Sequence, residues 1–282
     1  MATPVPFSAP FRRFVLLLVS LLLIVAPLGA AERDRVIAFL EVTGFGVALD
    51  SIALSGDYAP GILGMSPGDF GPDWARITAE VFDSDRMRRT AVDILERTLS
   101  DAALLHASAF YASDLGQRLV AEENAAHMLA DDELRDAEGE ALLVAASAGD
   151  GARRAALARL SNAVGDVEQS LRAAQELQVR FILAASDAGV LEQEIDEGTL
   201  RAVLAADAQE LRESLVRSGL VSAAYTYRSF TIAELDAYTD ALHEPLMQEV
   251  YELMNAVQHE ITVQRFEALA VRMGRIGRGQ EL

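Results

Sequence analysis

The sequence predicts an all-α protein, a bundle of about ten to twelve helices with no sheet. Apolar residues recur at helical spacing, as in Trp74, Ile77 and Val81, which places them on one face of a helix. Capping residues stand where helices should begin, and Thr231 with Glu234 has the spacing of a capping box. We find no convincing run of the alternating pattern that half-buried strands show. Together these observations favour helices packed on helices.

The first half of the chain should begin with two short helices, one ending near Thr43 and one running through Leu49, with Gly44-Phe45-Gly46 between them. Residues 55–72 are so rich in Gly and Pro that we expect one long irregular loop. Amphipathic helices should then occupy residues 72–82, 84–95, about 101–113, about 114–130 and about 131–147.

The second half starts at the clearest break in the pattern, Gly149-Asp150-Gly151. A long helix should follow from Val167 to Ala185, then a turn-rich connection at residues 187–198, and further helices at residues 211–225, 231–242 and 245–261. We therefore expect two similar helical units, residues 31–149 and 150–282, packed as one all-α domain.

The N-terminus has the pattern of a cleaved signal peptide. Two arginines precede the apolar run Phe14–Ala26, and small residues follow it. This run is short of the roughly 20 residues that cross a bilayer. We expect residues 1–30 to be removed, with cleavage after Ala30 or Ala31, and the mature protein to be periplasmic or secreted without stable membrane insertion.

The composition excludes several classes of function. The chain has no cysteine, which excludes disulfides and thiol chemistry. Its 43 acidic residues outnumber 24 basic residues, all of them arginine, and the net charge is −19. Nucleic acids and anionic membranes recruit proteins through clustered positive charge, so neither is an expected partner.

Two segments far apart in the chain share a pattern. Ser100–Val120 and Thr231–Tyr251 each open with a hydroxyl residue suited to a helix N-cap. Each continues with a leucine, a large apolar residue and the start of a second helix, at Asp114 and Pro245 respectively. We interpret these repeated segments as two helical hairpins that arose by internal duplication, although any two amphipathic hairpins share such features.

The stretch Phe110–Gln117 in the first repeated segment reads Phe-Tyr-Ala-Ser-Asp-Leu-Gly-Gln. With Asp114 in place of Pro, it resembles the phrase Phe-Tyr-x-Ser-Pro-Leu-Gly-Gln of a known bacterial family of exported helical proteins, domain of unknown function 2059. Residues 230–235 match the opening of the phrase at the second site, where Met247 replaces the Gly. The resemblance implies an exported all-α protein and supplies no activity, cofactor or catalytic residue.

No motif predicts catalysis, a cofactor or a metal site. Glu123 and His127 have the spacing of two ligands on one helix face, but we find no third ligand. No serine stands in a Gly-x-Ser-x-Gly turn, and a phosphate loop needs a lysine, which this chain lacks. Aromatic residues gather around the repeated segments, and we expect them to be core: Phe110, Tyr111, Tyr225, Tyr227, Phe230 and Tyr238.

The loop expected at residues 55–72 is the best candidate for a contact surface, because long loops in compact domains often act as lids or binding segments. Its apolar content is unusual for a solvated linker, and we favour cover over the helical core, with partner or ligand contact and disorder as the alternatives. The candidate partner or ligand contacts are Tyr58, Ile62, Met65, Phe70 and Trp74.

These patterns favour a non-catalytic module of the cell envelope that binds another protein or a small apolar ligand, with no cofactor. One alternative is a periplasmic hydrolase that uses two carboxylates. A pair of acids in one deep pocket would favour this hydrolase over the binding module. The other alternative is a structural envelope protein, which would self-associate.

Overall fold

The computed structural model describes residues 28–129, 132–147 and 151–280. In this part of the chain every regular element is helical, no strand is present, and twelve helices are eight residues or longer. The all-α prediction is confirmed. The signal peptide expected at residues 1–30 lies almost wholly outside the described residues.

The helices of the first half follow the predicted order closely. They are α2 (Leu28–Val42), α3 (Phe45–Ser51), the 3-10 helix η1 (Ile52–Tyr58), α4 (Ala59–Ile62), the 3-10 helix η2 (Pro67–Phe70), α5 (Trp74–Val81), α6 (Ser84–Thr98), α7 (Asp101–Tyr111), α8 (Asp114–His127) and α9 (Asp132–Ser147).

The second half contains two helices that the sequence pattern does not predict, α10 and α12. Helix α10 buries a short stripe at Ala156, Leu157 and Leu160, which its alanines and arginines obscure in the sequence, and α12 buries no side chain at all. The helices of this half are α10 (Ala152–Val164), α11 (Val167–Asp187), α12 (Glu197–Ala206), α13 (Ala208–Thr226), α14 (Ile232–Leu242) and α15 (Pro245–Gln280).

The prediction of one long irregular loop at residues 55–72 is wrong in part. Short helical turns, η1, α4 and η2, occupy most of this segment. Proline fits the first turn of a helix, where its missing N–H is not needed, and Pro60 and Pro67 both stand there. Ser66 and Asp69 complete a capping box at η2. In this segment Gly and Pro therefore limit the helices to single turns and do not prevent them from forming.

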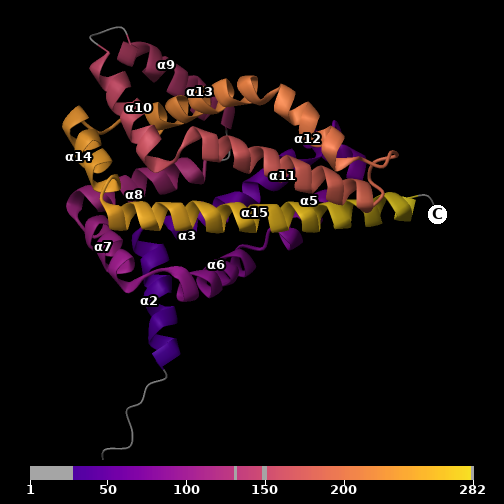
Figure 1. Cartoon of the computed structure of the whole chain (residues 1–282), viewed down its shortest axis with the longest axis horizontal. Coiled ribbons are helices and arrows are strands. Elements are labelled where there is room, and N and C mark those ends of the chain that lie inside the picture. The colour runs from indigo at the N-terminus through magenta and orange to yellow at the C-terminus, as the bar shows by residue number, and fades with distance from the viewer. Residues whose placement is uncertain (1–27, 130–131, 148–150, 281–282) are drawn as a thin grey trace, which may run out of the picture.

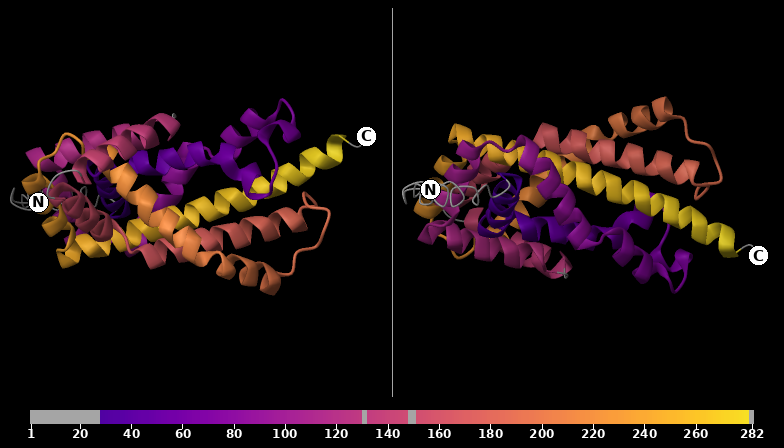
Figure 2. Two further views of the ribbon diagram at one scale, coloured as in Figure 1. Left: turned by 90° about the horizontal axis from the view of Figure 1, so that it is seen from above. Right: turned by 90° about the horizontal axis from the view of Figure 1, so that it is seen from below.

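Helix α15 is the axis of the molecule and runs along most of its length (Figure 1). On one side it packs against η1, η2 and α5, and on another against α11 (Figure 2). Helix α7 also packs against α15, α10 against α14, and α9 against α13. Helices of the two halves thus contact each other directly, while the unit boundary near residue 149 stays a prediction.

Both repeated segments form the helical hairpins predicted for them, α7–α8 and α14–α15. The Ser100 hydroxyl caps α7 by accepting a hydrogen bond from the Ala103 amide, and Thr231 caps α14 by accepting one from Glu234. The second helices restart at Asp114 and Pro245. Their origin by duplication stays a hypothesis.

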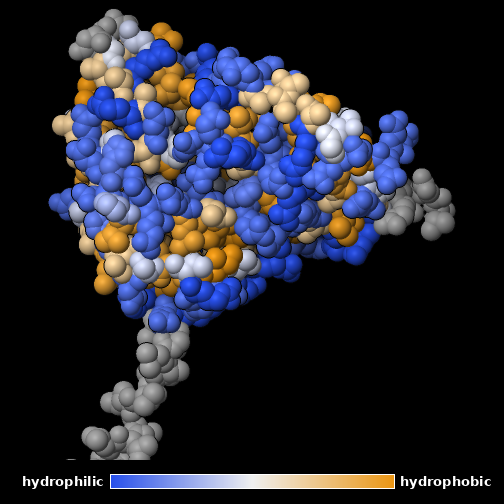
Figure 3. Space-filling model, in the orientation of Figure 1, coloured by the Kyte–Doolittle hydropathy of each residue, from blue (hydrophilic) through white to orange (hydrophobic). Residues whose placement is uncertain are grey.

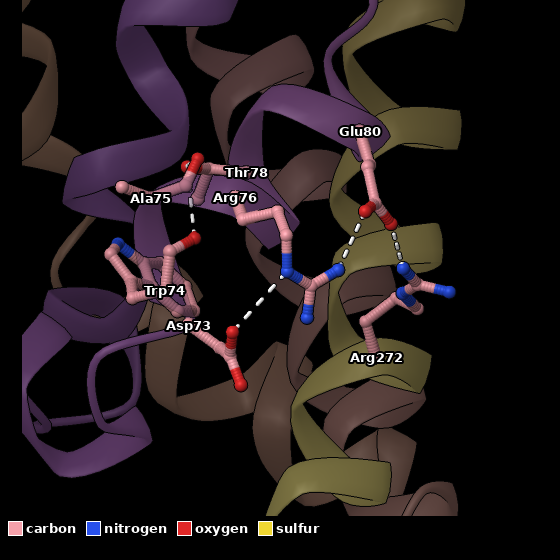
Figure 4. A network of polar contacts seen from close by, with 7 residues as sticks. All are labelled: Asp73, Trp74, Ala75, Arg76, Thr78, Glu80 and Arg272. Carbon is pink, nitrogen blue, oxygen red and sulfur yellow. Dashed lines mark hydrogen bonds and ion pairs between the residues drawn. The ribbon is translucent and has the colours of Figure 1, made fainter.

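A charged pair links α5 to the C-terminal part of α15, far from the turns of the two hairpins. Arg76 donates to Asp73 and to Glu80 on its own helix, at 3.2 and 2.6 Å (Figure 4). Glu80 also pairs with Arg272 of α15 across the helix interface. Exposed pairs such as these contribute little singly, so the buried apolar contacts must hold most of this interface together.

Hydrophilic residues cover most of the face drawn in Figure 3, with smaller hydrophobic areas between them. Among the described residues no single helix is long and apolar enough to cross a membrane; Glu32–Val42 and Phe45–Ile62, bent by 75°, pass by length and composition only as a pair.

Candidate functional site

A cavity of about 740 Å³ lies where the two halves of the chain meet. Helices α3, α8 and α9 and the turn η1 line it from the first half, and α10, α13, α14 and α15 line it from the second. Much of the wall is apolar, at Phe45, Ala48, Leu54, Ala126, Leu129, Leu160, Val164 and Ala223. This volume is typical of sites for small molecules. We call it the Glu123 cavity, after the carboxylate in its wall.

Glu123 projects from α8 onto the hydroxyl groups of two tyrosines of the second half. Its Oε1 accepts hydrogen bonds from Tyr227 Oη at 2.7 Å and from Tyr238 Oη at 3.0 Å. Both tyrosines are buried, and Tyr238 is wholly inaccessible. A carboxylate held this way has been moved from water into a protein interior, where hydrogen bonds compensate only part of the lost hydration.

Two further tyrosines extend this arrangement into the core. The hydroxyl oxygens of Tyr111, Tyr238 and Tyr251 form a triangle with separations of 2.9, 2.5 and 2.7 Å. A tyrosine has one proton to donate, and Tyr238 gives its proton to Glu123. Tyr111 and Tyr251 are therefore the donors within the triangle. We call these three residues and Tyr227 the tyrosine cluster.

Burial changes the pKa values of Glu123 and of the tyrosines that contact it. The pKa of Glu123 is raised from 4.5 to about 7, because burial disfavours the charged carboxylate more than the hydrogen bonds from Tyr227 and Tyr238 favour it. The pKa values of Tyr227 and Tyr238 lie well above 10, first through burial and then through the negative charge of Glu123. The carboxyl group thus changes its charge near neutral pH while the tyrosines keep their protons.

Contacts on both sides of α8 hold Glu123 in place. Arg118, on the same helix, pairs with Glu234 of α14 at 2.6 Å, and its guanidinium lies 4.9 Å above the Phe230 ring. On the other side Gly44 turns the chain between α2 and α3 with a φ of 77°, a conformation that favours glycine. A Cβ at Gly44 would also lie 2.7 Å from Asn124 Oδ1, so the close approach requires glycine as well.

Asn124 carries an unsatisfied polar atom in the cavity wall. Its Oδ1 is buried and has no hydrogen-bond partner among the described residues. A buried acceptor without a donor costs about 1–3 kcal/mol. This oxygen lies behind the surface of the wall, so its cost is part of packing α8 against the turn at Gly44.

Polar groups from the second half complete the lining. Asn255 of α15 donates through Nδ2 to the Val164 carbonyl at 3.3 Å. The other uncharged polar side chains of the wall are Thr43, Ser51, Ser55, Ser161, Ser222, Thr226 and Gln258. The cavity thus combines apolar walls with a few hydrogen-bonding groups, as binding pockets do.

The residues predicted to contact a partner or ligand lie in different places. Tyr58 is 60% exposed and lines the Glu123 cavity. Ile62 and Met65 are half-buried and pack on the core. Phe70 and Trp74 are buried with their ring centroids 5.1 Å apart, and Trp74 donates to Asp57. The structure therefore brings Tyr58 to the cavity and places the other four elsewhere.

The sequence contains the residues of the site but does not indicate that Glu123 and the tyrosines lie together. Glu123 attracts notice through its spacing from His127, and both do line the cavity. Among the described residues no group of three or more His, Cys, Asp or Glu side chains is placed to hold a metal ion. The partners of Glu123 are tyrosines more than 100 residues away, expected to be core, and buried as expected. The gathering of tyrosines around both repeated segments was the one usable signal.

Tyr238→Phe should destabilise the protein by about 1–3 kcal/mol, because it leaves buried hydroxyls without their partner. It should also raise the pKa of Glu123 further, since the hydrogen bond from Tyr238 stabilises the carboxylate. Chemical denaturation and NMR titration of the Glu123 carboxyl carbon measure the two effects. Tyr225→Phe is the control, because the Tyr225 ring lies under Arg228 away from the cluster. An unchanged pKa in Tyr238→Phe would contradict the hydrogen bond.

One family of known sequences matches part of the chain. The family model described as "Uncharacterized protein conserved in bacteria (DUF2059)", the family that the first repeated segment resembles, matches residues 85–143. This stretch holds most of α6, all of α7 and α8 with Glu123, and much of α9. The second repeated segment lies outside it. No curated protein matches, and no solved structure matches.

Proposed function

We propose that this protein is a non-catalytic binding module of the cell envelope, and that its ligand is a small molecule with an apolar body held in the Glu123 cavity. The cavity itself carries the proposal. Its volume of about 740 Å³ suits a drug-sized molecule, and its wall combines apolar side chains with a few polar groups.

Binding of Nile red, an uncharged fluorescent dye, tests this proposal. We expect saturable binding with one site per protein and a rise in fluorescence as the dye leaves water. Ala126→Trp places an indole in the cavity and should weaken dye binding at least tenfold. Ala125→Trp is the matched control, since Ala125 is the exposed neighbour on the same helix. Absence of binding, or equal binding by both variants, would overturn the proposal.

The alternative function, a hydrolase, would use the same Glu123 carboxylate. A pKa of about 7 suits a general acid or base, and Asp57 lines the same cavity as Glu123. Asp57, however, accepts a hydrogen bond from Trp74 Nε1 at 3.2 Å on the η1 side. Incubation of the protein with extracts of its native envelope, followed by mass spectrometry, separates the two functions. A bound compound recovered unchanged favours binding, and its conversion favours the hydrolase.

Export is part of the proposal and is supported by the sequence pattern around Phe14–Ala26. N-terminal sequencing of the protein from fractionated bacteria tests it. We expect the periplasmic or secreted protein to begin at Ala31 or Glu32. Recovery of the intact N-terminus from the cytoplasm would contradict export.

A further inference from the structure

We propose that the ligand of the Glu123 cavity is a small organic cation, an ammonium group on an apolar body, with Glu123 as its counter-ion. This inference rests on the proposed binding function and adds the chemical class of the ligand. A carboxylate oxygen without a donor, the charges around the cavity and its aromatic wall each support it.

The Glu123 carboxylate presents an acceptor that lacks a donor. Glu123 Oε1 already accepts two hydrogen bonds, whereas no hydrogen bond from the described residues ends on Oε2. The carboxylate has room for about four hydrogen bonds in all. Oε2 is also absent from the buried atoms without a partner, which places it in contact with the open space of the cavity. An ammonium group has donors and no acceptor, which is the complement of Oε2.

The charges around Glu123 favour a cation over an anion. Asp57 of η1 adds a second carboxylate to the lining. Arg135 of α9 also lines the cavity, but it donates to Asp136 through Nη2 at 3.2 Å. His127 of α8 is exposed at the lining. A ligand carboxylate or phosphate would meet Glu123 without a dedicated cationic partner, and such a contact is repulsive.

The groups that face Glu123 from the other elements are uncharged hydroxyls. They come from Tyr227 after α13, Tyr238 of α14 and, one contact further, Tyr251 of α15 and Tyr111 of α7. Their pKa values lie above 10, so they stay neutral across the physiological range. Phe45, Tyr227 and Tyr251 also contribute aromatic rings to the cavity wall, and cations bind favourably to ring faces.

Protons and ligand should compete for Glu123. A bound cation stabilises the carboxylate, and a proton on Glu123 removes the charge that the cation needs. With a pKa of about 7, the ionised fraction falls roughly thirtyfold between pH 8 and pH 5.5. Affinity for a cation should fall by a similar factor, whereas affinity for a neutral molecule of the same shape should not.

Displacement of Nile red by two probes of equal shape tests the inference on the full chain. One probe is 2-phenylethylamine, which stays protonated at both pH values, and the other is neutral 2-phenylethanol. At pH 8 we expect the amine to displace the dye at a concentration at least tenfold lower than the alcohol. At pH 5.5 this preference should disappear.

Two neighbouring carboxylates supply the matched variants. Glu123→Gln keeps the shape of the side chain and should remove the preference for the amine at both pH values. Glu122→Gln removes a charge on the same helix that pairs with Arg228 and does not line the cavity, and it should keep the preference.

The outcomes separate the two proposals. Equal displacement by amine and alcohol, with dye binding still lost in Ala126→Trp, would overturn the cationic ligand and leave the binding function standing. Dye binding that Ala126→Trp does not weaken would overturn both. Equal loss of the preference in Glu122→Gln and Glu123→Gln would also overturn the inference, because general surface charge would then explain it.

Discussion

Glu123→Gln should stabilise the protein by roughly 3 kcal/mol at pH 8.5 and leave its stability near pH 4 almost unchanged. The pKa of Glu123 is about 7 in the folded protein and 4.5 as the ordinary value. A tenfold difference in proton affinity corresponds to about 1.4 kcal/mol, which gives the size of the effect. The folded protein binds the proton more tightly, so the stabilisation is complete below pH 4.5 and is lost as the pH rises through 7. Glutamine is neutral throughout and avoids this loss.

The measurement is the free energy of unfolding by denaturant at several pH values between 4 and 9. The difference between variant and wild type isolates residue 123, because the other carboxylates titrate alike in both proteins. For a chain of this size the shift in Tm at pH 8.5 should be about 5–10 °C. Glu122→Gln is the control and should follow the wild-type curve. Parallel curves for Glu123→Gln and wild type would show that the carboxylate is not held in a desolvated place.

Gly116→Ala should destabilise the protein by about 3 kcal/mol, a large effect for one methyl group. A Cβ at this position would lie 2.4 Å from the Phe110 carbonyl oxygen and 2.5 Å from Tyr111 Cα. Both atoms belong to the backbone of α7, so no side chain can rotate away, and α7 and α8 would have to separate. Since α8 carries Glu123 and α7 carries Tyr111, the variant should also disturb the tyrosine cluster.

Thermal and denaturant unfolding measure the loss, and the NMR signal of the Glu123 carboxyl group reports the disturbance. Gly61→Ala is the matched control, because a Cβ there meets nothing within 4 Å and should change stability by less than about 0.5 kcal/mol. A Gly116→Ala protein as stable as wild type would mean that the two helices are not in such close contact.

Local rules were enough to predict most of the fold. The N-caps at Ser100 and Thr231 and the restart at Asp114 depend on residues within one or two turns, and the structure confirms them. The same rules were wrong for residues 55–72, because they treat Gly and Pro as breaks and this segment forms single turns. They missed α12 because a helix that buries nothing has no apolar stripe to detect.

Local rules could not predict the site, because contacts between residues far apart in the chain form and stabilise it. Glu123 in the sequence is one of many acids on an exposed-looking helix. Only the packing of α8 against the second half brings Tyr227 and Tyr238 to its Oε1, and only that packing raises its pKa. The unsatisfied oxygen of Asn124 could not be predicted either, because its burial depends on the turn at Gly44.

The position of α15 at the end of the chain has a consequence for biogenesis. This helix supplies Tyr251 to the tyrosine cluster and packs against α5, α7 and α11. A nascent chain emerges from its N-terminus, so Glu123 is made long before the residues that complete its surroundings. The burial that raises the pKa of Glu123 to about 7 can therefore form only after the second half of the chain has been made. The proton affinity of residue 123 reports the packing of α8 against that second half.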